Sequence, residues 1–148
     1  QCNIIISTKR VVHYMAKKEY FDNKKVAWFF KAAGCISVDR SKKDEDAKKA
    51  ALSVLEAGGA IGLFPEGTRN RTNAFLLPFK FGAVSMAQKT DSYLIPFGIS
   101  GDYKFRSKNL IVVIGKPFKV GKDLEKANEQ LRNEVLCLIE KSKKMSGK

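Results

Sequence analysis

The stretch AIGLFPEGTR, residues 60–69, is the most informative part of this sequence. Its first half, residues 60–64, is a compact apolar run of the kind that forms a strand buried on both faces of a sheet. Glu66 and Arg69 follow directly, with Gly67 between them, where the backbone is free to bend or to approach a ligand closely. Ligands of open α/β sheets bind outside the carboxyl ends of the strands, so we expect a binding site at this turn.

The side chains of this turn favour an anionic ligand. The guanidinium of Arg69 is a planar fork that matches a phosphate group, and each charge-assisted hydrogen bond contributes about 1.5–3 kcal/mol. Glu66 is close enough along the chain to orient the arginine or to accept a hydrogen bond from a substrate hydroxyl. The residues alone leave one alternative open, a solvated Pro-Glu-Gly turn with an ion pair at the surface.

Strands and helices alternate on either side of this turn, and residues 65–78 are expected to form a long polar loop. This order predicts an α/β fold: a single domain over residues 1–148, with a mostly parallel twisted sheet flanked by helices and a frayed basic tail at residues 141–148. The apolar patterns predict strands at residues 11–16, 36–38, 60–64, 93–99 and 110–114, and helices at 23–33, 79–89 and 124–143.

Local signals set the ends of two helices. Asp22 is the expected N-terminal cap of the helix at residues 23–33, and Gly34 suits its C-terminal end. Asp44 is the expected cap of a further helix, which Gly58 closes. One apolar stripe runs along that helix at residues Ala47, Ala50, Ala51, Val54 and Leu55.

The composition is that of a globular chain, with 44% hydrophobic and 29% charged residues, which excludes disorder throughout. The 28 Lys and Arg residues against 15 Asp and Glu residues give a net charge of +13, which points to an anionic partner: nucleic acid, an anionic membrane surface or an acidic carrier protein. The lysines are spread over every element and accompany no nucleic-acid motif, so a nucleic-acid-binding module is the weakest of these alternatives.

No apolar run approaches the roughly 18 residues that a membrane-spanning helix needs. The three cysteines predict neither a zinc cage nor a disulfide framework, because they are odd in number and widely spaced.

Several blocks of the sequence resemble those of the glycerolipid acyltransferases, the family of 1-acylglycerol-3-phosphate (lysophosphatidic acid) acyltransferases. They follow one another in the order of that family, over about residues 9–120. The blocks are FPEGTR at residues 64–69, GCISVDR at 34–40, FKFGA at 79–83, LIPFGI at 94–99 and GKP at 115–117.

The resemblance implies an acyl transfer in phospholipid biosynthesis. A fatty acyl group passes from acyl-CoA or acyl carrier protein to the free hydroxyl of 1-acyl-sn-glycerol-3-phosphate (lysophosphatidic acid), giving phosphatidic acid. Neither a metal nor a tightly bound cofactor is implied. In the family, the arginine of the GCISVDR-like block and the Glu, Gly and Arg of the FPEGTR block hold the glycerol phosphate. Carried over residue by residue, and with Thr68 and Lys80 added, the expected phosphate site comprises Arg40, Glu66, Gly67, Thr68, Arg69 and Lys80.

The family's first block, H-x-x-x-x-D, supplies a histidine as general base and an aspartate that orients it, and we do not expect this dyad in the chain. The only histidine, His13, lies inside a predicted strand, and five residues later stands Lys18 instead of an acid. Aligning the apolar run that follows the dyad with residues 4–6 puts Cys2 at the aspartate position. We therefore expect a chain truncated at its N-terminus, with no catalytic residues of its own, that binds but does not turn over. The alternative is a catalytically inactive family member that binds lysophospholipid or membranes.

The helix at residues 23–33 carries the last expectation. Its Trp28 projects away from the apolar stripe, among lysines, and an aromatic side chain in that setting is typical of a contact with an anionic membrane surface. We expect peripheral attachment to the cytoplasmic side of a membrane; the alternative is a Trp28 buried against a neighbouring element. The stripe assigned to the core comprises Val26, Phe29, Phe30 and Ala33, and the opposite face comprises Phe21, Lys24, Trp28 and Lys31.

Overall fold

The protein is represented by a computed structural model that describes residues 11–39, 41, 44–72, 74–101 and 110–146. The chain divides into two compact units, unit 1 (residues 1–64) and unit 2 (residues 65–148). The division therefore falls inside the FPEGTR block, between Phe64 and Pro65.

Unit 1 is built on a parallel three-stranded sheet. Its central strand is β1 (Val12–Lys17), with β2 (Ile36–Val38) on one side and β3 (Ala60–Gly62) on the other. The second half of β1 pairs with β2 and the first half with β3, and both pairs are parallel. The α/β alternation and the parallel sheet predicted from the sequence are thus confirmed in this unit, although β3 is shorter than the predicted strand at residues 60–64.

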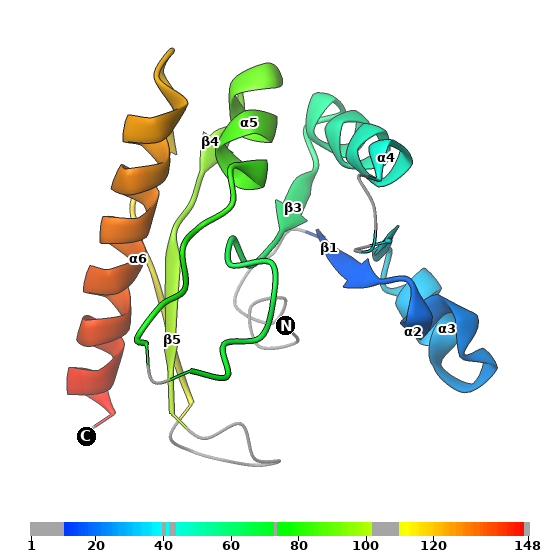
Figure 1. The fold of residues 1–148 in the computed structure, drawn as a ribbon, viewed down its shortest axis with the longest axis horizontal. Coiled ribbons are helices and arrows are strands. Elements are labelled where there is room, and N and C mark those ends of the chain that lie inside the picture. Colours follow the sequence, from blue (N-terminus) through cyan, green and yellow to red (C-terminus); the bar gives the residue numbers. More distant parts are fainter. Residues whose placement is uncertain (1–10, 40, 42–43, 73, 102–109, 147–148) are drawn as a thin grey trace. The chain divides into compact units, whose positions relative to one another are not determined.

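The core of unit 1 lies between this sheet and helix α4 (Glu45–Glu56), which contacts β2 and β3 (Figure 1). Asp44 caps the helix as predicted, because its Oδ1 accepts a hydrogen bond of 3.0 Å from the backbone N–H of Ala47. Ala47 and Ala51 of the predicted stripe are buried, whereas Ala50 is exposed, so the buried face of α4 is narrower than predicted.

The sheet itself contributes one tightly packed pair to this core. Tyr14 of β1 is completely buried, and its ring lies directly over Gly62 of the neighbouring strand β3. A Cβ atom at position 62 would collide with the ring, so this pairing requires glycine there.

Two helices connect β1 to β2, where the sequence predicted one. The short α2 (Glu19–Asp22) is followed by α3 (Lys24–Ala32). The predicted cap Asp22 is wrong, because this residue is the last of α2; Asn23 caps α3 instead, and its Oδ1 accepts a hydrogen bond of 3.1 Å from Lys25 N–H. Both Asp and Asn are good N-terminal caps. Asn23 caps α3 because α2 extends to Asp22 and α3 begins only at Lys24.

Unit 2 contains two antiparallel strand pairs. β5 (Phe97–Ser100) pairs with β6 (Ile111–Ile114), and β4 (Tyr93–Leu94) pairs with β7 (Phe118–Lys119). The single strand predicted over β4 and β5 is interrupted at Pro96, which has no N–H to donate to a sheet ladder. The prediction of parallel pairing therefore holds for unit 1, while both pairs described in unit 2 are antiparallel.

The long helix α6 (Leu124–Met145) lies along β5 and β6 (Figure 1). The approach is close because β5 has Gly98 at the contact, where a Cβ atom would meet the backbone of Leu138. The helix continues to Met145, so residues 141–145 are helical rather than frayed, and Ser142 is completely buried.

The remaining helix of unit 2, α5 (Gly82–Lys89), begins three residues later than predicted. Phe79 and Lys80 precede it, because the N–H of Lys80 donates to the carbonyl of Pro65 and not to a helical partner. Among the described residues of the predicted loop at 65–78, none belongs to a helix or strand, as expected. The buried residues of α5 are Ala83, Val84, Met86 and Ala87.

Candidate functional site

The turn at residues 65–69 is held by a later segment of the same unit. Gly67 has a φ of +67°, in the left-handed region that residues with a Cβ atom rarely adopt. The backbone N–H of Lys80 donates to the Pro65 carbonyl at 2.9 Å, and the Glu66 Oε2 accepts from the backbone N–H of Leu77 at 2.8 Å. The protein's own hydrogen bonds therefore fix the shape of the turn.

The carboxylate of Glu66 has a different partner from those expected. It was predicted to orient Arg69 or to accept from a substrate hydroxyl, but Oε2 is occupied by the Leu77 amide. No ion pair joins Glu66 to Arg69 in the part of the chain that the structure describes. Glu66 thus has a structural role at the turn, and a bond from its other oxygen to a substrate hydroxyl stays a prediction.

The side chain of Lys80 lies across the turn, over Gly67. A Cβ atom built on Gly67 would lie 3.0 Å from Cδ and Cε of Lys80 and 3.1 Å from its Nζ. The glycine therefore makes room for the lysine as well as supplying the positive φ. Of the predicted phosphate-site residues, the structure brings together Glu66, Gly67 and Lys80, from sequence segments more than ten residues apart.

The other predicted cation of the turn, Arg69, is exposed, as is Thr68 beside it. Neither side chain forms a hydrogen bond or an ion pair with another residue within the described ranges. The guanidinium is therefore available to an anionic ligand. Arg40 lies outside the described residues, so its position relative to the turn stays a prediction.

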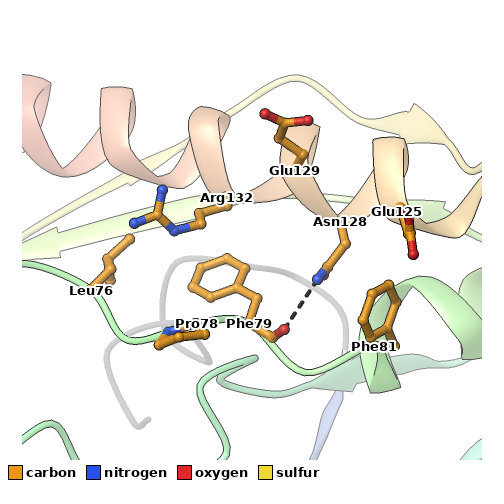
Figure 2. A pocket seen from close by; sticks show the side chains of 8 residues that line it. All are labelled: Leu76, Pro78, Phe79, Phe81, Glu125, Asn128, Glu129 and Arg132. Atoms are coloured by element: carbon orange, nitrogen blue, oxygen red, sulfur yellow. Dashed lines mark hydrogen bonds between the residues drawn. The ribbon is translucent and has the colours of Figure 1, made fainter.

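A groove of about 430 Å³ lies beside this segment, between residues 76–81 and α6 (Figure 2). Its apolar side comes from the segment and its polar side from the helix. Across it, Nδ2 of Asn128 donates a hydrogen bond of 3.1 Å to the carbonyl of Phe79. The lining residues are Leu76, Pro78, Phe79, Phe81, Glu125, Asn128, Glu129 and Arg132.

The contribution of α6 was missed in the sequence analysis, which predicted a helix at residues 124–143 but assigned it no part in the site. A signal existed, because Glu125, Asn128, Glu129 and Arg132 recur at helical spacing and form a polar stripe of their own. Nothing in the sequence indicated which segment this stripe would meet. That contact joins residues 49 positions apart.

A second candidate site, the aromatic surface, lies in unit 1 and consists of Tyr20, Val26, Trp28 and Phe29. The exposed fractions of these four residues are 47%, 36%, 67% and 49%, and α3 has no buried residue. The ring of Trp28 meets that of Phe29 edge to face, with 6.1 Å between the centroids. Exposed apolar side chains gathered on two consecutive helices make this face a candidate interaction surface.

The surroundings of the aromatic surface are cationic. Lys24, Lys25 and Lys31 belong to α3, and none of them forms an ion pair in the described part of the chain. By contrast, Lys17 pairs with Glu19, and this bond lowers the pKa of the carboxyl from its ordinary value. Within the described ranges, none of the helices contains an apolar run long enough to cross a bilayer.

Two expectations about α3 are corrected. Val26 and Phe29 were assigned to the core stripe but are exposed. Phe21 was assigned to the face of Trp28, but it is half-buried and its ring centroid lies 5.8 Å from that of Phe30. Phe21 was misplaced because a helix ends and another begins at Asn23, so the rotation of 100° per residue does not carry over from α2 to α3.

His13 is a structural residue of β1, as predicted. It is half-buried, and its Nδ1 lies 2.8 Å from the carbonyl oxygen of Gly34, the glycine that follows α3 with a φ of +64°. Lys18 stands at the position that would have to hold the acid of the H-x-x-x-x-D block. The geometry thus ties His13 to the end of a helix and gives it no carboxylate partner among the described residues.

Comparison with known families agrees with the sequence blocks. Residues 3–100 match the family described as Acyltransferase. The chain belongs to the acyltransferase family. The matched range includes the GCISVDR and FPEGTR blocks, on which the resemblance was based.

Curated relatives carry a more specific name. The chain is 36% identical over 110 residues to a 1-acyl-sn-glycerol-3-phosphate acyltransferase of Bacillus subtilis, a match that covers 72% of this chain and 54% of the relative. It is 31% identical over 126 residues to the enzyme of that name from Saccharomyces cerevisiae, covering 72% of this chain and 42% of the relative. The chain thus spans about half the length of the curated relatives it matches.

A solved structure shows the same fold. The 1-acyl-sn-glycerophosphate (LPA) acyltransferase PlsC from Thermotoga maritima superimposes with a TM-score of 0.69 at 21% identity, over 93% of this chain and 58% of that protein. The predicted glycerolipid acyltransferase-like fold is therefore confirmed.

Proposed function

We propose that this protein transfers a fatty acyl group from an acyl thioester to 1-acyl-sn-glycerol-3-phosphate and so forms phosphatidic acid for phospholipid biosynthesis. The observation that carries the proposal is the Lys80 side chain lying over Gly67 in the FPEGTR block, with Arg69, which has no ion-pair partner among the described residues, two positions further on. Two cations beside a preformed turn are what a phosphate monoester needs. The names of the curated relatives support the same reaction.

The reaction needs a base but no redox partner. The acceptor's hydroxyl oxygen attacks the thioester carbonyl carbon, a C–O bond forms and the C–S bond breaks. The hydroxyl proton passes to the base and from there to the departing thiolate of the donor, which leaves as the free thiol. Neither a metal nor a tightly bound cofactor enters this scheme.

The base is assigned to the histidine of the family's H-x-x-x-x-D block and not to His13. The hydrogen bond of His13 to Gly34 and the lysine at position 18 support this assignment. Residues 1–148 are then a binding unit without turnover of their own. A member that binds lysophospholipid without catalysis is the second candidate, and the same two features favour it.

The proposed phosphate site comprises Arg40, Glu66, Gly67, Thr68, Arg69 and Lys80, of which Arg40, Arg69 and Lys80 supply the positive charge. The exposed state of Arg69 and the place of Lys80 support this set. The acyl donor, acyl-CoA or acyl carrier protein, is itself polyanionic, so the net charge of +13 suits either one.

The protein is also proposed to bind peripherally to an anionic membrane surface, on the cytoplasmic side, through α3. The exposed Trp28 and Phe29, with Lys24 and Lys31 on the same helix, support this contact. The acceptor lipid proposed above resides in such a surface, which gives the contact a purpose.

The proposal is tested by ligand binding to residues 1–148. Titration calorimetry compares a soluble short-chain 1-acylglycerol-3-phosphate with the monoacylglycerol that lacks the phosphate. Arg69→Ala and Arg40→Ala should each weaken binding of the phosphorylated ligand about 10- to 150-fold, since a charge-assisted bond contributes about 1.5–3 kcal/mol. Arg71→Ala is the matched control, because Arg71 is exposed and lies outside the FPEGTR block.

Equal affinity for the two ligands, or an equal loss in Arg71→Ala, would remove the phosphate site. Product formation by residues 1–148 supplied with an N-terminal H-x-x-x-x-D block separates the enzyme from the inactive alternative. There, the same substitutions should raise the acceptor KM more than they lower kcat. Retention on DNA, and not on anionic vesicles, would favour the nucleic-acid alternative.

A further inference from the structure

The segment that carries Lys80 is anchored from the side opposite the turn. Phe79 is buried, and its carbonyl oxygen accepts the hydrogen bond of 3.1 Å from Nδ2 of Asn128 on α6. The next residue is Lys80, whose N–H bonds to Pro65 and whose side chain covers Gly67. The peptide group between Phe79 and Lys80 is therefore bonded on both sides: its carbonyl oxygen accepts from α6, and its N–H donates to Pro65 at the turn of the proposed phosphate site.

The state of Asn128 singles it out from the other polar residues of α6. Its Oδ1 is buried and has no hydrogen-bond partner among the described residues. An unpaired buried acceptor is unfavourable, and an apolar side chain of similar size would avoid it. The favourable interaction of the Asn128 side chain is therefore the hydrogen bond that its Nδ2 donates to the carbonyl of Phe79.

From this geometry we infer that Asn128 is a positioning residue of the phosphate site: it holds the Phe79–Lys80 backbone where the Lys80 ammonium lies over Gly67. The same anchor acts on Glu66, because Leu77, on the same segment, donates to its carboxylate. Asn128 acts through this segment and touches no ligand. The inference deepens the proposed function, and its first test does not depend on that function.

The first test measures amide hydrogen exchange of residues 1–148. In Asn128→Leu, the amides of Leu77 and Lys80 should exchange about 3- to 10-fold faster, because one hydrogen bond less holds the segment closed. The amides of β5 should keep their wild-type rates. The matched control is Asn133→Leu, because Asn133 is an exposed asparagine of the same helix with no hydrogen bond to another described residue.

A second variant guards against misfolding. Asn128→Asp keeps the shape of the side chain, but its ionised carboxylate accepts and does not donate, so the same two amides should be released. Unchanged exchange at Leu77 and Lys80 in a folded Asn128→Leu or Asn128→Asp protein would overturn the inference.

The second test uses sn-glycerol 3-phosphate, with glycerol as the uncharged reference, and includes Lys80→Ala. Asn128→Leu should weaken phosphate binding by the same 3- to 10-fold factor, and Asn133→Leu should leave it unchanged. If Lys80→Ala weakens binding and Asn128→Leu does not, the positioning role is wrong. If neither changes it while the exchange rates respond, the proposed phosphate site fails and the anchoring of the segment stands.

Discussion

At the turn of residues 65–69, the Pro65 carbonyl accepts a hydrogen bond from Lys80 and the Glu66 carboxylate accepts one from Leu77, so the turn is held in place. Helix α3, by contrast, buries no residue, and its largest side chain, Trp28, is exposed. The turn is polar, with its carboxylate bonded to the protein. The aromatic surface is apolar, and its rings contact other aromatic rings, Trp28 meeting Phe29 and Phe29 meeting Phe30. The two regions differ in how much of their geometry the protein itself determines.

This difference matches the ligands proposed for them. A phosphate group is recognised by directional, charge-assisted hydrogen bonds, which depend on the positions of a few atoms. Apolar burial at a membrane interface is not directional and scales with the area removed from water. A fixed turn therefore suits the first ligand, and a set of exposed rings among lysines suits the second.

The largest effect is expected at the fixed turn, in Glu66→Leu. This change removes a charge-assisted hydrogen bond and leaves the Leu77 N–H without its acceptor, so the free energy of unfolding should fall by about 1.5–3 kcal/mol. Glu66→Gln keeps an acceptor at the same place and should lose less than about 1 kcal/mol. Urea unfolding followed by circular dichroism measures both variants.

The pair also separates two roles of Glu66. If the carboxylate works only through Leu77, Glu66→Gln should bind the phosphorylated ligand as the wild type does. A Gln variant of unchanged stability that loses the ligand would instead give Glu66 a direct contact with the substrate.

Much of the fold could be predicted because its signals are local. Asp44 caps α4, and Gly34 ends the α3 region with a positive φ, because both depend on residues within one turn of the chain. Pro96 carried an equally local signal against a single strand from Tyr93 to Ile99, and that signal was not used.

The candidate site was predictable only as a set of residues. The FPEGTR block pointed to Glu66 and Arg69, but the partner of Glu66 is Leu77, eleven positions away, and Asn128 is further still. Such contacts depend on how segments pack, which no local pattern records. Val26 and Phe29 of α3 were wrongly assigned to the core for a related reason: periodicity shows that apolar residues share one face of a helix, but not whether another segment packs on that face.

An intermediate effect is expected at the aromatic surface, on binding to vesicles of anionic phosphatidylglycerol. Trp28→Ser and Phe29→Ser should each weaken binding about 5- to 30-fold, since each removes an exposed ring from the interface. Binding should also weaken as salt screens the lysines. Tyr93→Ser is the matched control, because Tyr93 is an exposed aromatic of unit 2 beside Lys119.

Fluorescence of the single tryptophan gives a direct measurement. Trp28 is two-thirds exposed, so its emission should lie at long wavelength in solution and shift to the blue with phosphatidylglycerol vesicles but not with phosphatidylcholine vesicles. Emission that is already blue without vesicles, and stays there, would mean that Trp28 is covered in solution and the surface is not a docking site.

The smallest effect is expected at His13, the residue that would matter most if it were the catalytic base. His13→Gln keeps a side-chain donor near the Gly34 carbonyl, so the free energy of unfolding should change by less than about 1 kcal/mol, and the phosphorylated ligand should bind as before. Residues 1–148 should form no phosphatidic acid with or without this change. With an H-x-x-x-x-D block supplied ahead of residues 1–148, His13→Gln should keep kcat within about twofold, whereas loss of a general base costs about 10²- to 10⁴-fold. Product formation by residues 1–148 that His13→Gln abolishes would make His13 the base and transfer the catalytic centre to β1.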